Sequence, residues 1–335
     1  MRRAWCPLAS LWWLGCSAPG APSAAATPAP REAAPATVEA PREAAPAPPQ
    51  PLDACEEARR AASAPRPTDP DDLLFHVNRA RAIPAEYPVS STSIWSPCAP
   101  TPAPAKRTDD LVCIPARYSY RNREALRSVA FESDAPSSPS LTHDGLPVGR
   151  AGKVGFKALM DDAAAAGHTL TVRSGFRAYT MQSATFSGWV AAELAQGRSR
   201  EYALRKVSAS SARAGHSEHQ LGTTADLVFA RANGAVYDGW AQETIAESPA
   251  MTWVAANAHR FGLVMSYDKD HEAITEYVWE PWHYRFVGVA AADLMKRCGW
   301  TTEQYLDARY GEDGPSPVKR ARREPAGADH SPRVH

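Results

Sequence analysis

An N-terminal stretch, residues 17–51, places the strongest limit on how this chain folds, because it consists mainly of Ala, Pro, Ser, Thr and Glu. Such a composition cannot bury enough apolar surface to form a core, so it predicts an extended, semi-rigid linker. The composition becomes typical of a globular protein from Leu73 onward. We therefore expect a disordered linker at 27–70, a single folded domain at 71–310, and a disordered polar and basic tail at 311–335.

The first residues, 1–26, have the pattern of an export signal. Arg2 and Arg3 precede a short apolar stretch at 5–14, which is well below the roughly 20 residues that span a bilayer. Leu14-Gly15-Cys16 resembles the end of a bacterial lipobox, in which the cysteine carries lipid; ordinary cleavage near residues 24–26 is the alternative. We expect an exported protein of the periplasm or cell envelope, in contact with the membrane only through a lipid anchor at Cys16.

The charge balance and the cysteines indicate which binding partners and which cellular compartment to expect. Lys plus Arg and Asp plus Glu both number 37, so the net charge of zero gives no reason to expect a nucleic-acid partner. In an oxidising compartment the four cysteines beyond the signal can pair in three ways, and Cys98–Cys113 is the natural local pair. These four cysteines are Cys55, Cys98, Cys113 and Cys298.

Hydrophobic periodicity and capping residues predict a mixture of helices and strands. We expect helices at 153–166, 181–194, 248–260 and 289–298. We expect a strand at 169–172, and a hairpin formed by strands at 263–267 and 274–279. There is no regular βαβ alternation and no G-x-G-x-x-G motif, so the pattern indicates an α+β domain with a small antiparallel sheet flanked by helices.

Three short motifs carry the candidate chemistry. In the first, Asp226 follows His219 by seven positions, and Gly222 between them can take the backbone conformation of a sharp turn. Imidazole nitrogen and carboxylate oxygen are both zinc ligands. A histidine in a polar loop is, however, more often a hydrogen-bonding residue than a ligand.

The second motif is Glu280-Pro281-Trp282-His283. A catalytic zinc site has three protein ligands, an open position for water, and an acid beside that water. His219, Asp226 and His283 would supply the ligands and Glu280 the acid. The alternative interpretation makes Glu280 a surface acid and packs His283 among neighbouring aromatic side chains.

The third motif, at residues 173–182, directly follows the strand predicted at 169–172. A guanidinium at a strand end, such as that of Arg177, can stabilise a developing oxyanion. Gln182 lies five positions further on, where it can donate to a substrate amide or carboxylate.

Taken together, the motifs resemble the VanY-type D-alanyl-D-alanine carboxypeptidases, within the metallopeptidases that share a fold with lysostaphin and the hedgehog signalling domain. The resemblance covers residues 73–308. The family pattern S-x-H-x-x-G-x-A-x-D is present with Thr224 where alanine is usual, and E-P-W-H is unchanged. The S-G-Y-R-S-x-x-x-Q pattern is present with Phe176 and Ala178 in place of tyrosine and serine.

The resemblance implies one Zn²⁺ per chain, held by His219, Asp226 and His283. It implies that Glu280 is the catalytic base and that Arg177 contacts the substrate carbonyl. Ser217 and Gln182 would help to hold the peptide end. His216 matches no ligand position and is expected either to support a ligand residue or to be structural. The expected substrate is a peptidoglycan stem peptide, from which a monomeric enzyme would release the terminal D-alanine.

Two groups of alternatives stay open at this point. Related enzymes are L,D-carboxypeptidases or peptidoglycan endopeptidases, and the sequence does not show the pocket shape that decides among them. A non-catalytic, cell-wall-binding lipoprotein that keeps zinc for stability is the alternative from another class. Glu280 favours the enzyme, because a structural zinc site needs no base.

Overall fold

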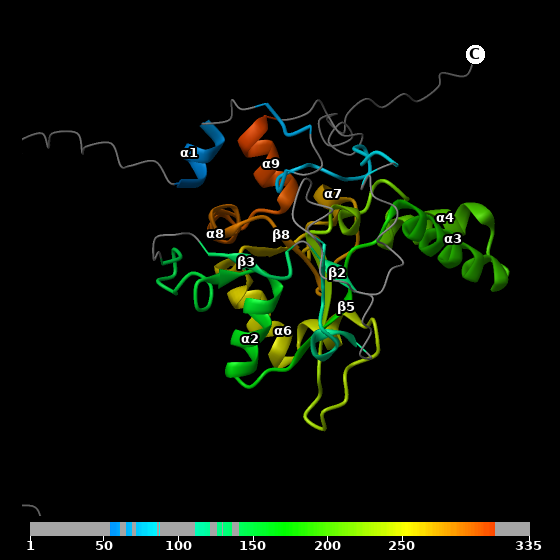
Figure 1. Ribbon diagram of the computed structural model, residues 1–335. Coiled ribbons are helices and arrows are strands. Elements are labelled where there is room, and N and C mark those ends of the chain that lie inside the picture. Colours follow the sequence, from blue (N-terminus) through cyan, green and yellow to red (C-terminus); the bar gives the residue numbers. More distant parts are fainter. Residues whose placement is uncertain are drawn as a thin grey trace, which may run out of the picture. The chain divides into compact units, whose positions relative to one another are not determined.

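The computed structural model describes residues 54–60, 65–68, 72–85, 87, 111–120, 126–128, 130–135 and 141–311 (Figure 1). The predicted export signal with Cys16, and the predicted tail beyond Gly311, lie outside these residues.

The main sheet has four strands in the order β5-β6-β8-β7, and each neighbouring pair is antiparallel. Its strands are β5 (Leu170–Ser174), β6 (Thr224–Phe229), β8 (His283–Phe286) and β7 (Leu263–Met265). All residues of the central strands β6 and β8 are buried. Two smaller antiparallel pairs join β1 (Val112–Cys113) to β2 (Arg127–Ser128) and β3 (Ser133–Asp134) to β4 (Lys153–Val154).

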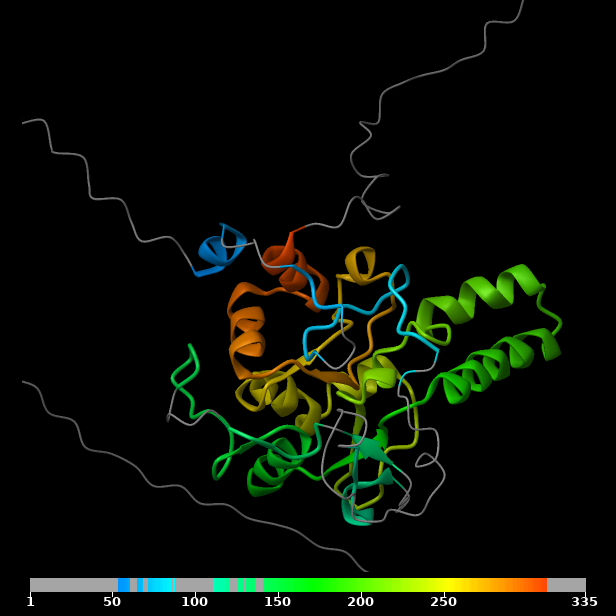
Figure 2. The same ribbon diagram turned by 45° about the horizontal axis from the view of Figure 1, so that its top comes forward.

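Helices surround this sheet in the described part of the chain, so the predicted α+β class is confirmed (Figure 1). The α-helices are α1 (Ala54–Arg60), α2 (Phe156–Ala165), α3 (Tyr179–Ala195), α4 (Arg200–Ser210), α5 (Gln242–Ala246), α6 (Pro249–Asn257), α7 (Glu272–Thr275), α8 (Val289–Cys298) and α9 (Thr302–Tyr310). The 3₁₀ turns are η1 (Ala116–Tyr118), η3 (Glu218–Leu221) and η4 (Ala258–Phe261). Helices α3 and α4 lie side by side and extend away from the sheet (Figure 2).

The core forms where α2 and α6 pack on the sheet. Helix α2 buries one apolar face, which includes Phe156 and Leu159, against the strand residues Val172 and Leu227. Among the predicted helices, α6 has a start that is set by a capping side chain. The Ser248 side chain accepts a hydrogen bond from the Met251 amide at the start of α6, as expected for an N-cap.

One predicted hairpin is wrong in its second strand. Strand β7 pairs with β8 at 283–286, whereas residues 272–275 form the short helix α7. The apolar and aromatic residues between Ile274 and Trp279 were interpreted as a strand. Glu276, with a φ of 65°, instead ends a single helical turn, and Tyr277 is then buried beyond it.

The predicted disordered linker is wrong at residues 54–60, which form helix α1. Helix α1 packs against α8 and α9, and a disulfide joins Cys55 to Cys298, across a sequence separation of 243. Cys113 also forms a disulfide; Cys98, its predicted partner, lies outside the described residues. Within the described residues, no helix combines the length and apolar character that a bilayer crossing requires.

The Cys55–Cys298 bond should contribute measurably to stability, because it closes a very long loop in the unfolded chain. We expect the double variant Cys55→Ser, Cys298→Ser to lose about 2–4 kcal/mol of unfolding free energy. Denaturant titration of the oxidised proteins measures this loss. Reductant should then destabilise the double variant less than the wild type. Equal unfolding midpoints for the two oxidised proteins would contradict the expectation.

Candidate metal centre

The centre of the main sheet brings two of the predicted ligands together through strand register. Asp226 on β6 lies directly opposite His283 on β8, and Ser174 on β5 lies opposite Asp226 on its other side. Side chains at directly opposed positions project from the same face of a sheet. The backbone pairing itself therefore aligns Ser174, Asp226 and His283 in one row.

The third predicted ligand, His219, lies on η3, immediately before β6. Gly222 ends η3 in the left-handed conformation, with a φ of 74°, and the chain then enters β6. This is the turn that the sequence predicts between His219 and Asp226. The carbonyl of His219 accepts hydrogen bonds from the amides of Gly222 and Arg177, both at 3.2 Å, which fixes the turn against the segment after β5.

The three side chains converge at distances that suit a tetrahedral metal. Asp226 Oδ1 lies 3.3 Å from His219 Nε2 and 3.3 Å from His283 Nδ1. The two imidazole rings are nearly perpendicular, at 86°. Metal–ligand bonds of about 2.0–2.2 Å in a tetrahedron separate the ligand atoms by roughly 3.3–3.6 Å. The observed separations therefore match two edges of a zinc tetrahedron.

The outer nitrogen of each histidine is held by an acceptor. His219 Nδ1 donates to the carbonyl of Gly175 at 2.7 Å, and His283 Nε2 pairs with Glu218 Oε2 at 3.0 Å. Such partners fix the tautomer and orientation of a metal-binding histidine. When the imidazoles are neutral, their inner nitrogens, which face Asp226, carry the lone pairs that a metal ion needs.

Glu218 is in turn held by Arg285, and both side chains are almost completely buried. Arg285 Nη1 donates to Glu218 Oε1 at 2.9 Å, and Nη2 donates to the carbonyls of Leu73 and Phe75. Burial alone would raise the pKa of Glu218, but Arg285 and His283 lower it to about 2. The pairing of Glu218 with Arg285 was not predicted from the sequence. In the sequence, the two residues are visible only as charged neighbours of predicted ligands: Glu218 precedes His219, and Arg285 follows His283 by two positions.

The electrostatic field at the centre favours a cation. Burial by itself lowers the pKa of His283, yet Asp226 and Glu218 outweigh burial and raise this pKa to about 10. Asp226 Oδ1 is buried and makes no hydrogen bond within the described part of the chain. A divalent cation at this point would satisfy the oxygen and both inner nitrogens, so the residues present fit zinc.

Glu280 lies next to the three candidate ligands. Its Oε2 is 3.5 Å from His283 Nδ1, and its backbone amide donates to the carbonyl of Tyr267 at 2.9 Å. Burial raises the pKa of Glu280 to about 7. A carboxyl group that titrates near neutrality can both accept and return a proton.

The other predicted site residues have different surroundings. Arg177 and Ser217 line the cavity that contains the metal centre, and Arg177 Nη1 donates to Ser174 Oγ at 3.3 Å. Gln182 does not line this cavity. It is fully buried, and its Nε2 donates to the carbonyl of Ala212 at 2.6 Å, so its direct contact is with a residue of the cavity wall.

The cavity has a volume of about 470 Å³. One wall contains Trp240 and Trp282, whose rings are 4.9 Å apart. Helices α3 and α4 supply another wall, where Lys206 pairs with Glu193 at 2.7 Å. Trp240, Lys206 and Glu193 were not identified from the sequence, because the cavity that they share exists only in the fold. Trp282 belongs to the second sequence motif but was given no role there.

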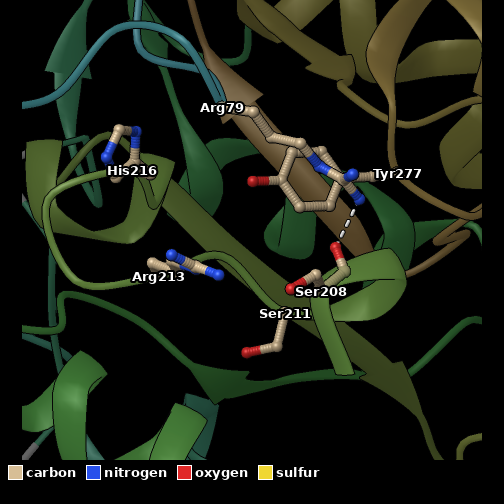
Figure 3. A pocket seen from close by; sticks show the side chains of 6 residues that line it. All are labelled: Arg79, Ser208, Ser211, Arg213, His216 and Tyr277. Atoms are coloured by element: carbon tan, nitrogen blue, oxygen red, sulfur yellow. Dashed lines mark hydrogen bonds between the residues drawn. The ribbon is translucent and has the colours of Figure 1, made fainter. Parts of the chain in front are cut away.

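A smaller cavity of about 290 Å³ shares the residues Ser211 and Tyr277 with the first (Figure 3). Arg79 crosses it and donates to the carbonyl of Ser208. His216 lies at its edge, where its Nδ1 is hydrogen-bonded to the carbonyl of Asn78 at 2.8 Å. His216 therefore has a structural contact away from the metal centre, which is one of the two roles expected from the sequence.

A buried His₂Asp set, with a carboxyl group beside it at the wall of a cavity, defines a metallohydrolase site of the zinc type. Residues 150–289 match the family model "VanY: D-alanyl-D-alanine carboxypeptidase". This match over residues 150–289 confirms the resemblance stated from the sequence motifs.

The chain is also similar to individual known proteins. The YodJ protein of Bacillus subtilis (strain 168), which is assigned as a carboxypeptidase, is 27% identical over 71% of this chain and 68% of its own length. A D-alanyl-D-alanine carboxypeptidase of Enterococcus faecalis (strain ATCC 700802 / V583) is 34% identical over 44% of this chain and 52% of its own length. The solved structure of the LdcB LD-carboxypeptidase is similar with a TM-score of 0.47 and 24% identity, over 72% of this chain and 89% of that one.

The Glu218 contact to His283 should matter for metal affinity. We expect Glu218→Gln to weaken zinc binding by about 10–100-fold, because the charge that orients and polarises the imidazole is lost. Competition with a chromophoric chelator measures the change. Glu193→Gln is the matched control, since Glu193 lines the same cavity but pairs with Lys206. Equal zinc affinity in the Glu218 variant and the control would show that Glu218 does not support the metal.

Proposed function

We propose that this protein is an exported, zinc-dependent D-alanyl-D-alanine carboxypeptidase that removes the terminal D-alanine of peptidoglycan stem peptides. The observation that carries the proposal is the placement of Glu280 beside His219, Asp226 and His283 at the wall of one cavity. The family match over residues 150–289 supports the reaction type.

His219, Asp226 and His283 would hold the metal, one ion per chain. Bound zinc supplies a Lewis acid that polarises a carbonyl group and makes water a stronger nucleophile near neutral pH. The donor set of two imidazoles and one carboxylate is typical of catalytic zinc sites, which leave a position open.

Glu280 moves the proton in this mechanism. Its carboxylate accepts a proton from the attacking water and returns it to the amine nitrogen that leaves with D-alanine. Its burial favours this exchange, because a less solvated carboxylate holds a proton more strongly.

Arg177 stabilises the negative charge that develops on the substrate carbonyl oxygen. Its guanidinium lines the cavity, and Asp226 and Glu280 lie close enough to interact with its charge. A fixed cation in a site with little water stabilises such an oxyanion strongly. Ser217 can donate a hydrogen bond to the peptide end. Gln182 would act by holding Ala212, which lines the cavity, in place.

Export is part of the proposal. The Cys55–Cys298 disulfide suits an oxidising compartment, and the N-terminal residues have the pattern of a signal. A lipid at Cys16 would keep the enzyme at the membrane, and the residues at 17–51 would let it reach the cell wall as a monomer.

The test of the function uses the full chain and a synthetic stem pentapeptide that ends in D-Ala-D-Ala. We expect D-alanine release that a zinc chelator abolishes and added zinc restores. Release from a tetrapeptide in place of the pentapeptide would indicate the L,D-carboxypeptidase, and cleavage of cross-linked dimers would indicate the endopeptidase. Binding of zinc with no cleavage of any of these substrates would overturn the enzyme and favour the wall-binding protein.

The role of Glu280 has its own test. We expect Glu280→Gln to keep one equivalent of zinc at this centre and to lower the rate of D-alanine release by about 10²–10⁴-fold. Glu272→Gln, an exposed glutamate on α7, is the control and should retain full activity. Wild-type turnover in the Glu280 variant would remove this residue from the mechanism.

A further inference from the structure

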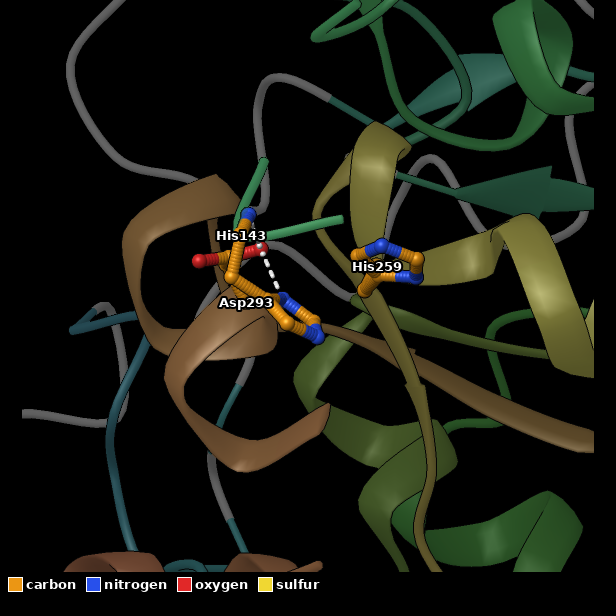
Figure 4. Close-up of side chains that lie close together, drawn as sticks. All are labelled: His143, His259 and Asp293. Carbon is orange, nitrogen blue, oxygen red and sulfur yellow. Dashed lines mark hydrogen bonds and ion pairs between the residues drawn. The ribbon is translucent and has the colours of Figure 1, made fainter. Parts of the chain in front are cut away.

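A second group of side chains with metal-binding chemistry lies away from the cavity, within the part of the chain that the structure describes. It consists of His143, His259 and Asp293, and each offers a ligand atom within 4.8 Å of the others. The three residues come from separate segments, namely the loop at 141–149, the turn η4 and helix α8 (Figure 4).

The contacts within this group are those of ligands that face one another. His143 Nδ1 lies 2.9 Å from Asp293 Oδ1, and the rings of His143 and His259 are 5.7 Å apart. Asp144 adds a second carboxylate, because its Oδ2 lies 3.1 Å from His259 Nε2. Two imidazoles and two carboxylates therefore meet in one small volume.

The loop that presents His143 and Asp144 is already ordered by its own backbone. The Thr142 amide donates to the carbonyl of Leu146, and the Gly145 amide donates to that of Thr142, both at 2.9 Å. Two further bonds attach the loop to η4: the Gly149 amide donates to the Arg260 carbonyl at 2.8 Å, and Arg260 Nε donates to the Pro147 carbonyl at 3.0 Å. A metal would thus bind here with little additional ordering of the chain.

The Oδ1 atom of Asp293 faces His143: it accepts a hydrogen bond from the His143 amide at 3.2 Å and lies 2.9 Å from His143 Nδ1. Arg297 approaches the other oxygen, Oδ2, at 3.7 Å. His259 is buried, and His143 is partly exposed, with 27% of its side chain accessible. The group therefore has one buried ligand that gives it a fixed position and one exposed ligand through which an ion can enter.

We propose that His143, His259 and Asp293, with Asp144 beside them, form a second binding site for a divalent transition-metal ion of the zinc type. Imidazole ligands favour such ions over Ca²⁺ and Mg²⁺, which prefer oxygen ligands alone. The bound ion links the loop at 141–149 to η4 and α8 and so has a structural role. This site is independent of the proposed peptidase function, since it shares no residue with the cavity.

Zinc content per chain tests the site. After loading with Zn²⁺ and dialysis, the full chain should contain two zinc ions by elemental analysis. His143→Ala and Asp293→Ala should each contain one, and so should His219→Ala, which removes a ligand of the first centre. The double variant His143→Ala, His219→Ala should contain none. His168→Ala is the matched control, because this histidine packs on Trp253 outside both groups, and it should keep two.

Thermal unfolding provides a second readout that does not depend on activity. Added Zn²⁺ should raise the unfolding temperature of His219→Ala and should not raise that of the double variant, because only binding to the folded state stabilises it. His143→Ala should still release D-alanine if the proposed function is right, so the two proposals fail separately. One zinc per wild-type chain that is lost in His219→Ala, or two zinc ions in His143→Ala, would overturn the second site.

Discussion

The buried ion pair between Arg285 and Glu218 is the interaction on which the organisation of the centre depends. Glu218 orients His283, and Arg285 holds both Glu218 and the carbonyls of Leu73 and Phe75. One guanidinium thus joins strand β8, turn η3 and the segment at 72–85. Removing either partner would leave an uncompensated charge in the protein interior, which costs several kcal/mol, about 3–5 in measured cases. The position of one metal-binding nitrogen is therefore coupled to the stability of the domain.

The sheet carries Asp226 and His283, whereas His219 and Glu280 lie on segments beside it. Register alone places Asp226 opposite His283, and a rigid, buried strand pair holds ligands more precisely than a loop does. The turn at Gly222 then brings His219 to the same point. Helices α3 and α4 form a wall of the cavity without contributing a candidate ligand. The ligand set and the cavity wall are consequently carried by different parts of the fold.

The sequence allowed the α+β class, the helix α8 and the grouping of His219, Asp226 and His283 to be predicted, because these depend on local periodicity, capping and motif spacing. It did not allow Glu218, Arg285 or the wall residue Trp240 to be identified, since their roles arise from contacts between distant segments. The strand expected at 274–279 is absent for a related reason. A short run of apolar residues is compatible with a strand or with a single helical turn, and the sequence does not show which of these side chains the fold buries. Helix α1 was missed because its charged composition continues that of the linker, and its partner Cys298 is remote in the sequence.

The Cys55–Cys298 bond also determines how the domain responds to mechanical load. Tension applied to the chain ahead of α1 passes through covalent bonds to Cys55 and then, by way of sulfur, into helix α8. The segment at 72–85, whose carbonyls hold Arg285, lies after this junction and is shielded from the pull. With the N-terminal tether proposed above, a pull on the chain would therefore bypass the segment that positions Arg285, and the candidate histidine and carboxylate ligands would keep their positions.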